Sequence, residues 1–206
     1  MAWGFFSIWK GMVFMTNIYA PLKRYFLSLF FTLALSLISY VILNNIVAIV
    51  ISAASIIFTI IQIQSIYAMR NSCERIRKSF NFFIISLVGM IITLIITILS
   101  VFKQNIQLAL FSVIIMIVFA CFSIVADFQL IWGLDELIVK NGYNYPQGKI
   151  KWIFWFSIIN ALISGSLVNT GAIVQALIIG TVCSVCSLWL LYEYLQAVNE
   201  KENNQI

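Results

Sequence analysis

The apolar positions of the chain gather into six long runs separated by short polar segments. Each run is about 20 residues or longer, which is the length that an α-helix needs to cross roughly 30 Å of hydrocarbon. The runs are continuously apolar and lack the period-two alternation of a membrane β-strand, so we expect helices and not a closed barrel. The predicted spans are 25–43, 46–69, 80–102, 106–132, 150–168 and 172–192.

The composition also indicates a membrane protein. Of the 206 residues, 63% are hydrophobic and only 9% are charged, and the mean hydropathy is +1.04. A soluble domain of this size has about a quarter of its residues charged. The net charge of +5 is spread over loop clusters, and no basic stripe follows one element, which excludes a nucleic-acid partner. We therefore expect an all-α, polytopic integral membrane bundle that has membrane lipids as its surroundings.

The positions of lysine and arginine predict the orientation, because short cytoplasmic loops collect these residues. With the amino terminus inside, every lysine and arginine except Lys103 is cytoplasmic. The three outward turns, at 44–45, 103–105 and 169–171, are too short to form an outer domain. We expect both termini in the cytoplasm (N-in/C-in) and insertion in the plasma (cytoplasmic) membrane.

The chain divides into three successive helical hairpins, each entered from a basic flank and turned at an asparagine: Asn44, Asn105 and Asn169. These hairpins are either repeats or the ordinary result of the orientation rule, and both interpretations stay open. Residues 1–20 predict an amphipathic helix in the membrane interface. Residues 21–198 form the six-span domain, and 199–206 form a polar cytoplasmic tail.

Serine, threonine and glutamine side chains follow several spans at helical spacing. Where such faces converge they line a narrow polar path for a solute. The alternative is packing, because these hydroxyls also bond to carbonyls of their own helix. The first span carries Ser28, Thr32, Ser36 and Ser39 in such a stripe. The candidate path on the second and third spans consists of Ser52, Ser55, Thr59, Gln62, Ser86, Thr93 and Thr97.

Small residues recur every four positions on the last two spans, which allows helices to approach closely in lipid. We expect the two faces to meet in a tight antiparallel pair, with a dimerisation surface as the alternative. The residues are Ser157, Ala161 and Gly165 on the fifth span, and Ala176, Gly180 and Ser184 on the sixth.

Charged residues are nearly absent from the spans, and those within a membrane usually have a function. Asp127 and Glu193 are predicted near the cytoplasmic face, where they either attract a cation as inner-mouth carboxylates or pair with basic residues. The lack of a carboxylate at mid-membrane argues against a proton-coupled pump. A cytoplasmic basic cluster, a candidate partner surface, comprises Arg70, Arg75, Arg77 and Lys78.

The residues that enzymes need are mostly missing, so we expect a protein that is not an enzyme and has no cofactor or metal. The chain has no histidine, which removes histidine-assisted nucleophiles and histidine metal ligands. Cys183 and Cys186 form a C-x-x-C pair, but they are predicted near mid-bilayer, where a thiolate is poorly stabilised. Packing is the expected role of these cysteines.

Three functions remain open at this point. The first is a small solute or ion transporter, a channel, or a permease-like subunit. The second is a non-transporting membrane subunit, an immunity or accessory factor, or a scaffold that acts through its cytoplasmic loops. The third, a thiol redox enzyme, has the least support. A homo-oligomer or a protein partner is compatible with the first two.

Overall fold

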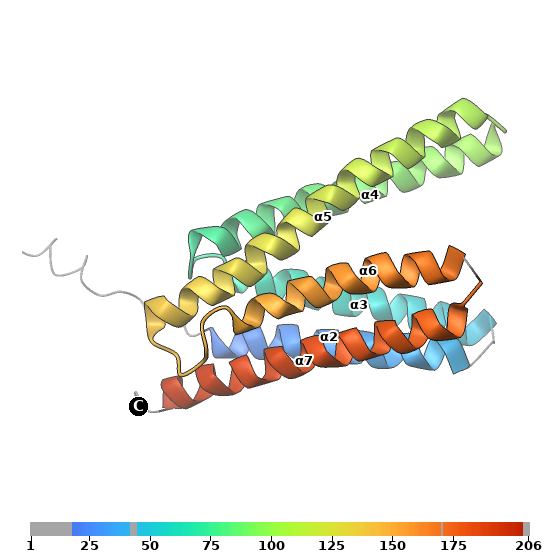
Figure 1. Cartoon of the computed structure of the whole chain (residues 1–206). Helices are drawn as coiled ribbons and strands as arrows, with labels where there is room; N and C mark the ends of the chain where they lie inside the picture. The colour runs from blue at the N-terminus through green and yellow to red at the C-terminus, as the bar shows by residue number, and fades with distance from the viewer. Residues whose placement is uncertain (1–17, 42–44, 170, 204–206) are drawn as a thin grey trace, which may run out of the picture.

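A computed structural model of the chain describes residues 18–41, 45–169 and 171–203 (Figure 1). These residues are almost entirely helical and contain no strand, which confirms the predicted all-helical fold. The interfacial helix predicted over residues 1–20 falls almost wholly outside the described part. The elements are α2 (Tyr19–Val41), α3 (Asn45–Met69), α4 (Glu74–Phe102), α5 (Ile106–Asn141), the 3₁₀ turn η1 (Lys149–Lys151), α6 (Trp152–Asn169) and α7 (Ile173–Asn203).

Five of these helices are long and apolar enough to cross a membrane: α2, α3, α4, α5 and α7. Their length and composition indicate a helical membrane protein. The remaining predicted span, the fifth (150–168), corresponds to α6, which has 18 residues and is therefore about 27 Å long.

Helices that follow one another in the chain pack as antiparallel pairs: α2 with α3, α4 with α5, and α6 with α7. Figure 1 shows α2, α3, α6 and α7 side by side, while the α4–α5 hairpin diverges from them toward its turn. We call the end where α2, α4 and α6 begin the basic end, and the opposite end the tips. Every described lysine and arginine lies at the basic end except Lys103, which lies at a tip.

Several helices continue well beyond the predicted spans at the basic end. Helix α5 has 36 residues and α7 has 31, so they are about 54 and 46 Å long, against roughly 30 Å of hydrocarbon. A search for apolar runs finds only the part that lies in lipid. The extensions alternate apolar and polar residues, as amphipathic helices do at a boundary with water.

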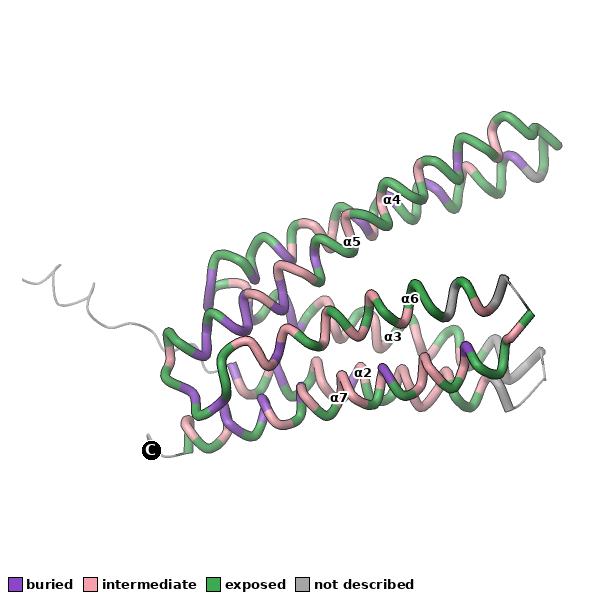
Figure 2. Tube along the Cα trace, in the orientation of Figure 1, coloured by how far each residue is buried: buried purple, intermediate pink, exposed green. Residues whose placement is uncertain are grey.

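The buried core of the molecule lies at this basic end. Figure 2 shows buried residues gathered there, while the tips are largely exposed. Large apolar side chains from different hairpins meet with almost no exposure, among them Ile66, Ile76, Leu134 and Val198. Burial of each such side chain from water contributes about 1.5–3 kcal/mol. The α4–α5 hairpin is thus joined to the other two mainly by this core, because it diverges from them toward its turn.

The loop between α5 and η1 is tied to this core. Helix α5 is capped by Gly142, whose left-handed backbone (φ +64°) accompanies a hydrogen bond from its N–H to the Ile138 carbonyl. The Tyr145 hydroxyl donates to the Leu190 carbonyl at 3.2 Å, and the Tyr194 hydroxyl donates to the Leu134 carbonyl at 3.0 Å. Burial raises the pKa of Tyr145, with a smaller contribution from the nearby Glu193 charge, so its phenol stays a donor.

The carboxyl-terminal part of α7 caps the start of α2. Glu202 Oε1 accepts hydrogen bonds from the backbone N–H groups of Ile18, at 3.1 Å, and Tyr19, at 3.3 Å. The first N–H groups of a helix have no partner inside it, and a negative charge there also interacts favourably with the helix dipole. Pro21, in the first turn, lacks an N–H group and is tolerated at that position.

Replacing Glu202 with alanine should therefore lower the stability by about 1 kcal/mol, as expected for loss of a helix cap. The measurement is the midpoint of thermal unfolding in detergent. Glu202→Gln keeps an acceptor oxygen and should lose less than the alanine variant. Glu200→Ala, at an exposed position of the same helix, is the matched control, and an equal effect of the two alanine variants would contradict the capping role.

Candidate functional site

A cavity of about 360 Å³ lies between α2, α5, α6 and α7. Small-molecule sites in proteins are usually about 300–1,000 Å³, mainly apolar, with a few polar groups placed among apolar ones. The cavity has this character. Its polar lining comprises Tyr25, Thr32 and Ser36 from α2, Asp127 from α5, Ser157 and Asn160 from α6, and Ser184 and Ser187 from α7.

Helical periodicity explains how each helix contributes one face to the cavity. On α2 the lining positions 25, 29, 32, 33 and 36 recur every three or four residues. The same spacing holds on α6, from Ile153 to Asn160, and on α7, from Cys183 to Leu191. Residues at this spacing share one side of a helix. The cavity is therefore assembled from local patterns on helices of all three hairpins.

Four hydroxyl groups of the cavity wall donate to their own helices, among them those of Thr32, Ser184 and Ser187. Thr32 Oγ1 donates to the Ser28 carbonyl at 2.8 Å, Ser184 Oγ to the Gly180 carbonyl at 2.8 Å, and Ser187 Oγ to the Cys183 carbonyl at 2.9 Å. A hydroxyl that has used its proton in this way still has oxygen lone pairs. These side chains therefore offer hydrogen-bond acceptors to a ligand.

Two carboxylates lie eight residues apart on α5, and their surroundings differ. Asp135 is 4% exposed, accepts a hydrogen bond from the Gly148 N–H at 2.6 Å and pairs with Lys151 Nζ at 2.8 Å. Asp127 is exposed at the edge of the cavity. Among the described residues it has no hydrogen bond or ion pair, although its charge interacts with the Tyr25 phenol. Asp127 is thus available to a ligand, whereas Asp135 is used within the fold.

Glu193, the second predicted inner-mouth carboxylate, does not line the cavity. It pairs with Lys149 and accepts a hydrogen bond from the Trp189 indole N–H at 2.9 Å. This pair links η1 to α7.

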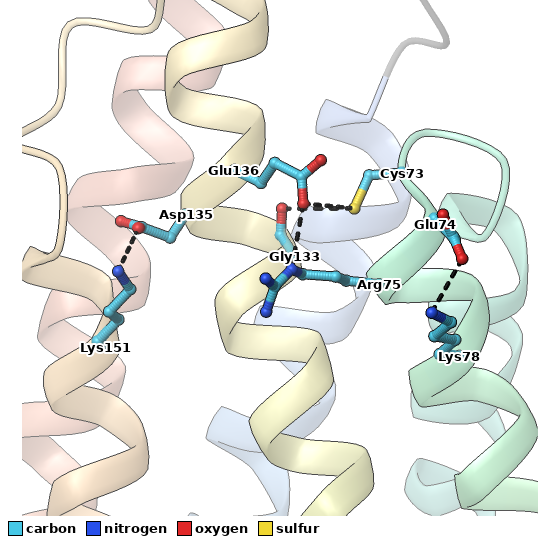
Figure 3. A network of polar contacts seen from close by, with 8 residues as sticks. All are labelled: Cys73, Glu74, Arg75, Lys78, Gly133, Asp135, Glu136 and Lys151. Atoms are coloured by element: carbon cyan, nitrogen blue, oxygen red, sulfur yellow. Dashed lines mark hydrogen bonds and ion pairs between the residues drawn. The ribbon is translucent and has the colours of Figure 1, made fainter.

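The basic cluster makes contacts within the chain, as Figure 3 shows for two of its members. Arg75 pairs with Glu136 at 3.3 Å, and Lys78 pairs with Glu74 at 2.9 Å. The Glu136 carboxylate also lies 3.9 Å from the Cys73 sulfur. Arg70 stacks over the ring of Tyr67, 3.7 Å from its centre, while Arg77 is exposed.

The candidate polar path on α3 and α4 lies outside the cavity. Ser86 and Thr97 contact α5, where Ser86 Oγ donates to the Phe119 carbonyl at 3.0 Å and Thr97 Oγ1 meets Ser112 Oγ at 3.2 Å. On α3, Ser52 is exposed and Gln62 is half-buried. The other three hydroxyls, those of Ser55, Thr59 and Thr93, donate to carbonyls four residues earlier in their own helices. Neither stripe lines the cavity between α2, α5, α6 and α7.

The small residues of the last hairpin are divided between helix contact and cavity. Helices α6 and α7 pack together, and a methyl group added to Gly180 would lie 3.1 Å from Asn160 Oδ1. Ala176 is buried on α7, Ala161 is exposed, and Gly165 is on α6. Ser157 and Ser184 border the cavity.

Sequence reasoning did not single out most of the lining residues, among them Tyr25, Phe154, Phe156 and Asn160. Asn160 stands in the middle of an apolar run, and an amide at that depth is itself an indication of a functional or interhelical role. The aromatic residues gave no such indication, because they are common in spans and near interfaces. Cys183 of the C-x-x-C pair also lines the cavity, whereas Cys186 does not. The thiols of both are free.

Comparison of the chain with protein families, with curated proteins and with solved structures finds no match. Its long apolar helices indicate the class of helical membrane proteins.

Proposed function

We propose that this protein binds a small solute in the cavity between α2, α5, α6 and α7 and carries it across the plasma membrane. The observation that supports the proposal is the cavity itself. In lipid, helices can pack without leaving a polar space between them, and burial of polar groups is costly unless they are used. A space with a carboxylate, hydroxyls and an amide, surrounded by apolar helices, is suited to a solute that must leave water.

The proposal includes six membrane crossings, with α6 as the fifth of them. Helix α6 packs along α7, and α7 is long and apolar enough to cross the membrane. The two helices are antiparallel and are joined by a short turn at a tip. If α7 crosses the hydrocarbon layer of the bilayer, α6 therefore crosses the same layer in the opposite direction. At about 27 Å, α6 is within the range for a short or slightly thinned crossing.

The basic end is proposed to lie in the cytoplasm, because lysine and arginine collect on that side of membrane proteins. The buried core and the ion pairs at the basic end would then lie on the cytoplasmic side of the membrane. The lining residues on α6 and α7 lie between Ile153 and Asn160 and between Cys183 and Leu191, in the half of the hairpin nearer the basic end. The cavity would therefore be in the cytoplasmic half of the bilayer.

The alternative, a non-transporting subunit that acts through the basic cluster, has less support. Three of the four residues in the cluster already have partners in the chain: Arg70 with Tyr67, Arg75 with Glu136 and Lys78 with Glu74.

The native cysteines provide a test. In a variant with Cys73, Cys121 and Cys186 replaced by serine, the remaining Cys183 lines the cavity. If the cavity holds water, a small, water-soluble methanethiosulfonate reagent should modify Cys183 in intact membranes, because thiols react as thiolates and need water to ionise. A variant that retains only Cys121, which is exposed on α5, is the matched control. Its thiol should react at least about tenfold more slowly than that of Cys183.

Sidedness separates carriage from simple binding. A membrane-impermeant reagent should reach Cys183 when added to either face, in right-side-out and in inverted vesicles, because a carrier must open its site to both sides. Access from one face only would contradict transport and leave a one-sided binding site. Reaction of Cys183 no faster than that of Cys121 would show that the cavity is dry and would overturn the proposed function.

A further inference from the structure

We propose that the ligand of this cavity is a small amphipathic organic cation, an amine or ammonium ion with an apolar body, and that Asp127 provides its counter-charge. The inference rests on the proposed function, since it names the class of solute that the same cavity would bind.

The charge of the cavity supports a cation. Among the described residues that line it, Asp127 has the single acidic side chain, and no lysine or arginine is present. The carboxylate has no hydrogen-bonded or ion-paired partner among the described residues, in contrast to Asp135, which is bound by Lys151 and the Gly148 N–H. Four of the wall hydroxyls, those of Thr32, Ser36, Ser184 and Ser187, donate to their own helices and so can present oxygen atoms to the cavity. An ammonium group, which has donors but no acceptors, matches such a wall.

The apolar part of the wall favours an organic ion over a metal ion. Tyr25, Phe154 and Phe156 line the cavity, and the faces of aromatic rings attract cations. Leucine and isoleucine side chains form much of the rest. Divalent metal ions such as Ca²⁺ need six to eight oxygen ligands at short distance, whereas the cavity has a single carboxylate. A volume of about 360 Å³ fits a small molecule with an apolar body.

The place where the cavity meets the surface indicates how such a molecule enters. Asp127 on α5 and Ser157 on α6 both line the cavity and are both exposed. Contacts between α5 and α6 are few, because the α4–α5 hairpin diverges from the other helices (Figure 1). An amphipathic cation, whose apolar body partitions into the bilayer, can therefore reach the carboxylate sideways between α5 and α6.

Three ligands of similar size and different charge test the inference: phenethylammonium, 2-phenylethanol and phenylacetate. Binding is measured by equilibrium dialysis to the full chain in lipid nanodiscs, with empty nanodiscs subtracted to remove partitioning into lipid. We expect phenethylammonium to bind at least about tenfold more tightly than the alcohol, a difference of about 1.4 kcal/mol. Phenylacetate should bind more weakly than either.

Variants of Asp127 test whether its carboxylate causes the preference for the cation. Asp127→Asn should reduce the affinity for phenethylammonium about tenfold and leave that for 2-phenylethanol unchanged, while Asp127→Glu should keep the preference. Glu193→Gln is the matched control, because it removes a carboxylate that does not line the cavity. The ligand series on the unmodified protein is itself decisive, so the inference stays testable if a variant at Asp127 does not fold.

The outcomes separate the two proposals. Equal binding of the amine and the alcohol, or a charge preference that persists in Asp127→Asn, would overturn cation recognition and leave a cavity that binds neutral solutes. If none of the three ligands binds, the inference fails. The reactivity of Cys183 then decides independently whether the cavity is open to water, as the proposed function requires.

Discussion

Replacement of Asp135 by alanine should destabilise the protein by about 3 kcal/mol, because it removes one partner of a largely buried ion pair. The carboxylate binds Lys151 Nζ at 2.8 Å and the Gly148 N–H at 2.6 Å, and thereby holds the loop and the start of α6 against α5. Asp135→Asn keeps an oxygen for the Gly148 N–H but loses the charge, so it should lie between the wild type and the alanine variant. The measurement is the midpoint of thermal unfolding in detergent.

A surface pair is the control for this experiment. Glu74 and Lys78 are four residues apart on α4 and both are exposed (Figure 3). Exposed pairs of this kind contribute little to stability, so Glu74→Gln should leave the midpoint nearly unchanged. If Asp135→Ala changed the unfolding midpoint as little as Glu74→Gln, the contacts of Asp135 with Lys151 and Gly148 would have no role in holding the hairpins together.

Replacement of Gly133 by alanine should have a comparable effect, for a steric reason. A methyl group at this position would lie 2.7 Å from Ile76 Cγ1 and 3.2 Å from the Ile76 backbone nitrogen. Because the backbone and the side chain of Ile76 are both too near to the added methyl group, α4 and α5 must move apart at the point where the buried core begins. Overpacking of this kind costs about 1–3 kcal/mol, and we expect a lower unfolding midpoint and a smaller yield of monodisperse protein.

Gly142→Ala is the matched control, since an added methyl group there meets no atom within 4 Å. Its only cost is the left-handed backbone (φ +64°), about 1 kcal/mol for a residue with a side chain. A larger loss at Gly142 than at Gly133 would contradict the close approach of α4 and α5.

The positions of the helices could be predicted from the sequence because each membrane helix satisfies its own backbone hydrogen bonds. The second span was predicted at 46–69, and α3 occupies Asn45–Met69. The ends at the basic side could not be predicted in the same way. Leu195 and Val198 stand among polar residues after the apolar run ends, and their burial depends on partners from other hairpins.

The candidate site was harder to predict than the helices. Asp127 was selected for its charge, and Thr32 and Ser36 belonged to a recognised stripe on the first span, yet nothing in the sequence indicated that these residues share one space. The stripes on α3 and α4 have the same spacing and composition, but they lie outside the cavity. Local periodicity identifies a face of a helix without identifying what that face meets.

The sequence by itself determined that the chain is helical and apolar, and where its helices lie, because those properties depend on residues near one another in the chain. Only the tertiary structure decided which polar residues surround a common cavity and which carboxylate stays available. Those outcomes depend on contacts between distant segments, such as that of Asp135 with Lys151 and that of Glu202 with the start of α2. Such contacts set how each helix is rotated and how far α5 stands from α6, and helix periodicity does not encode either quantity.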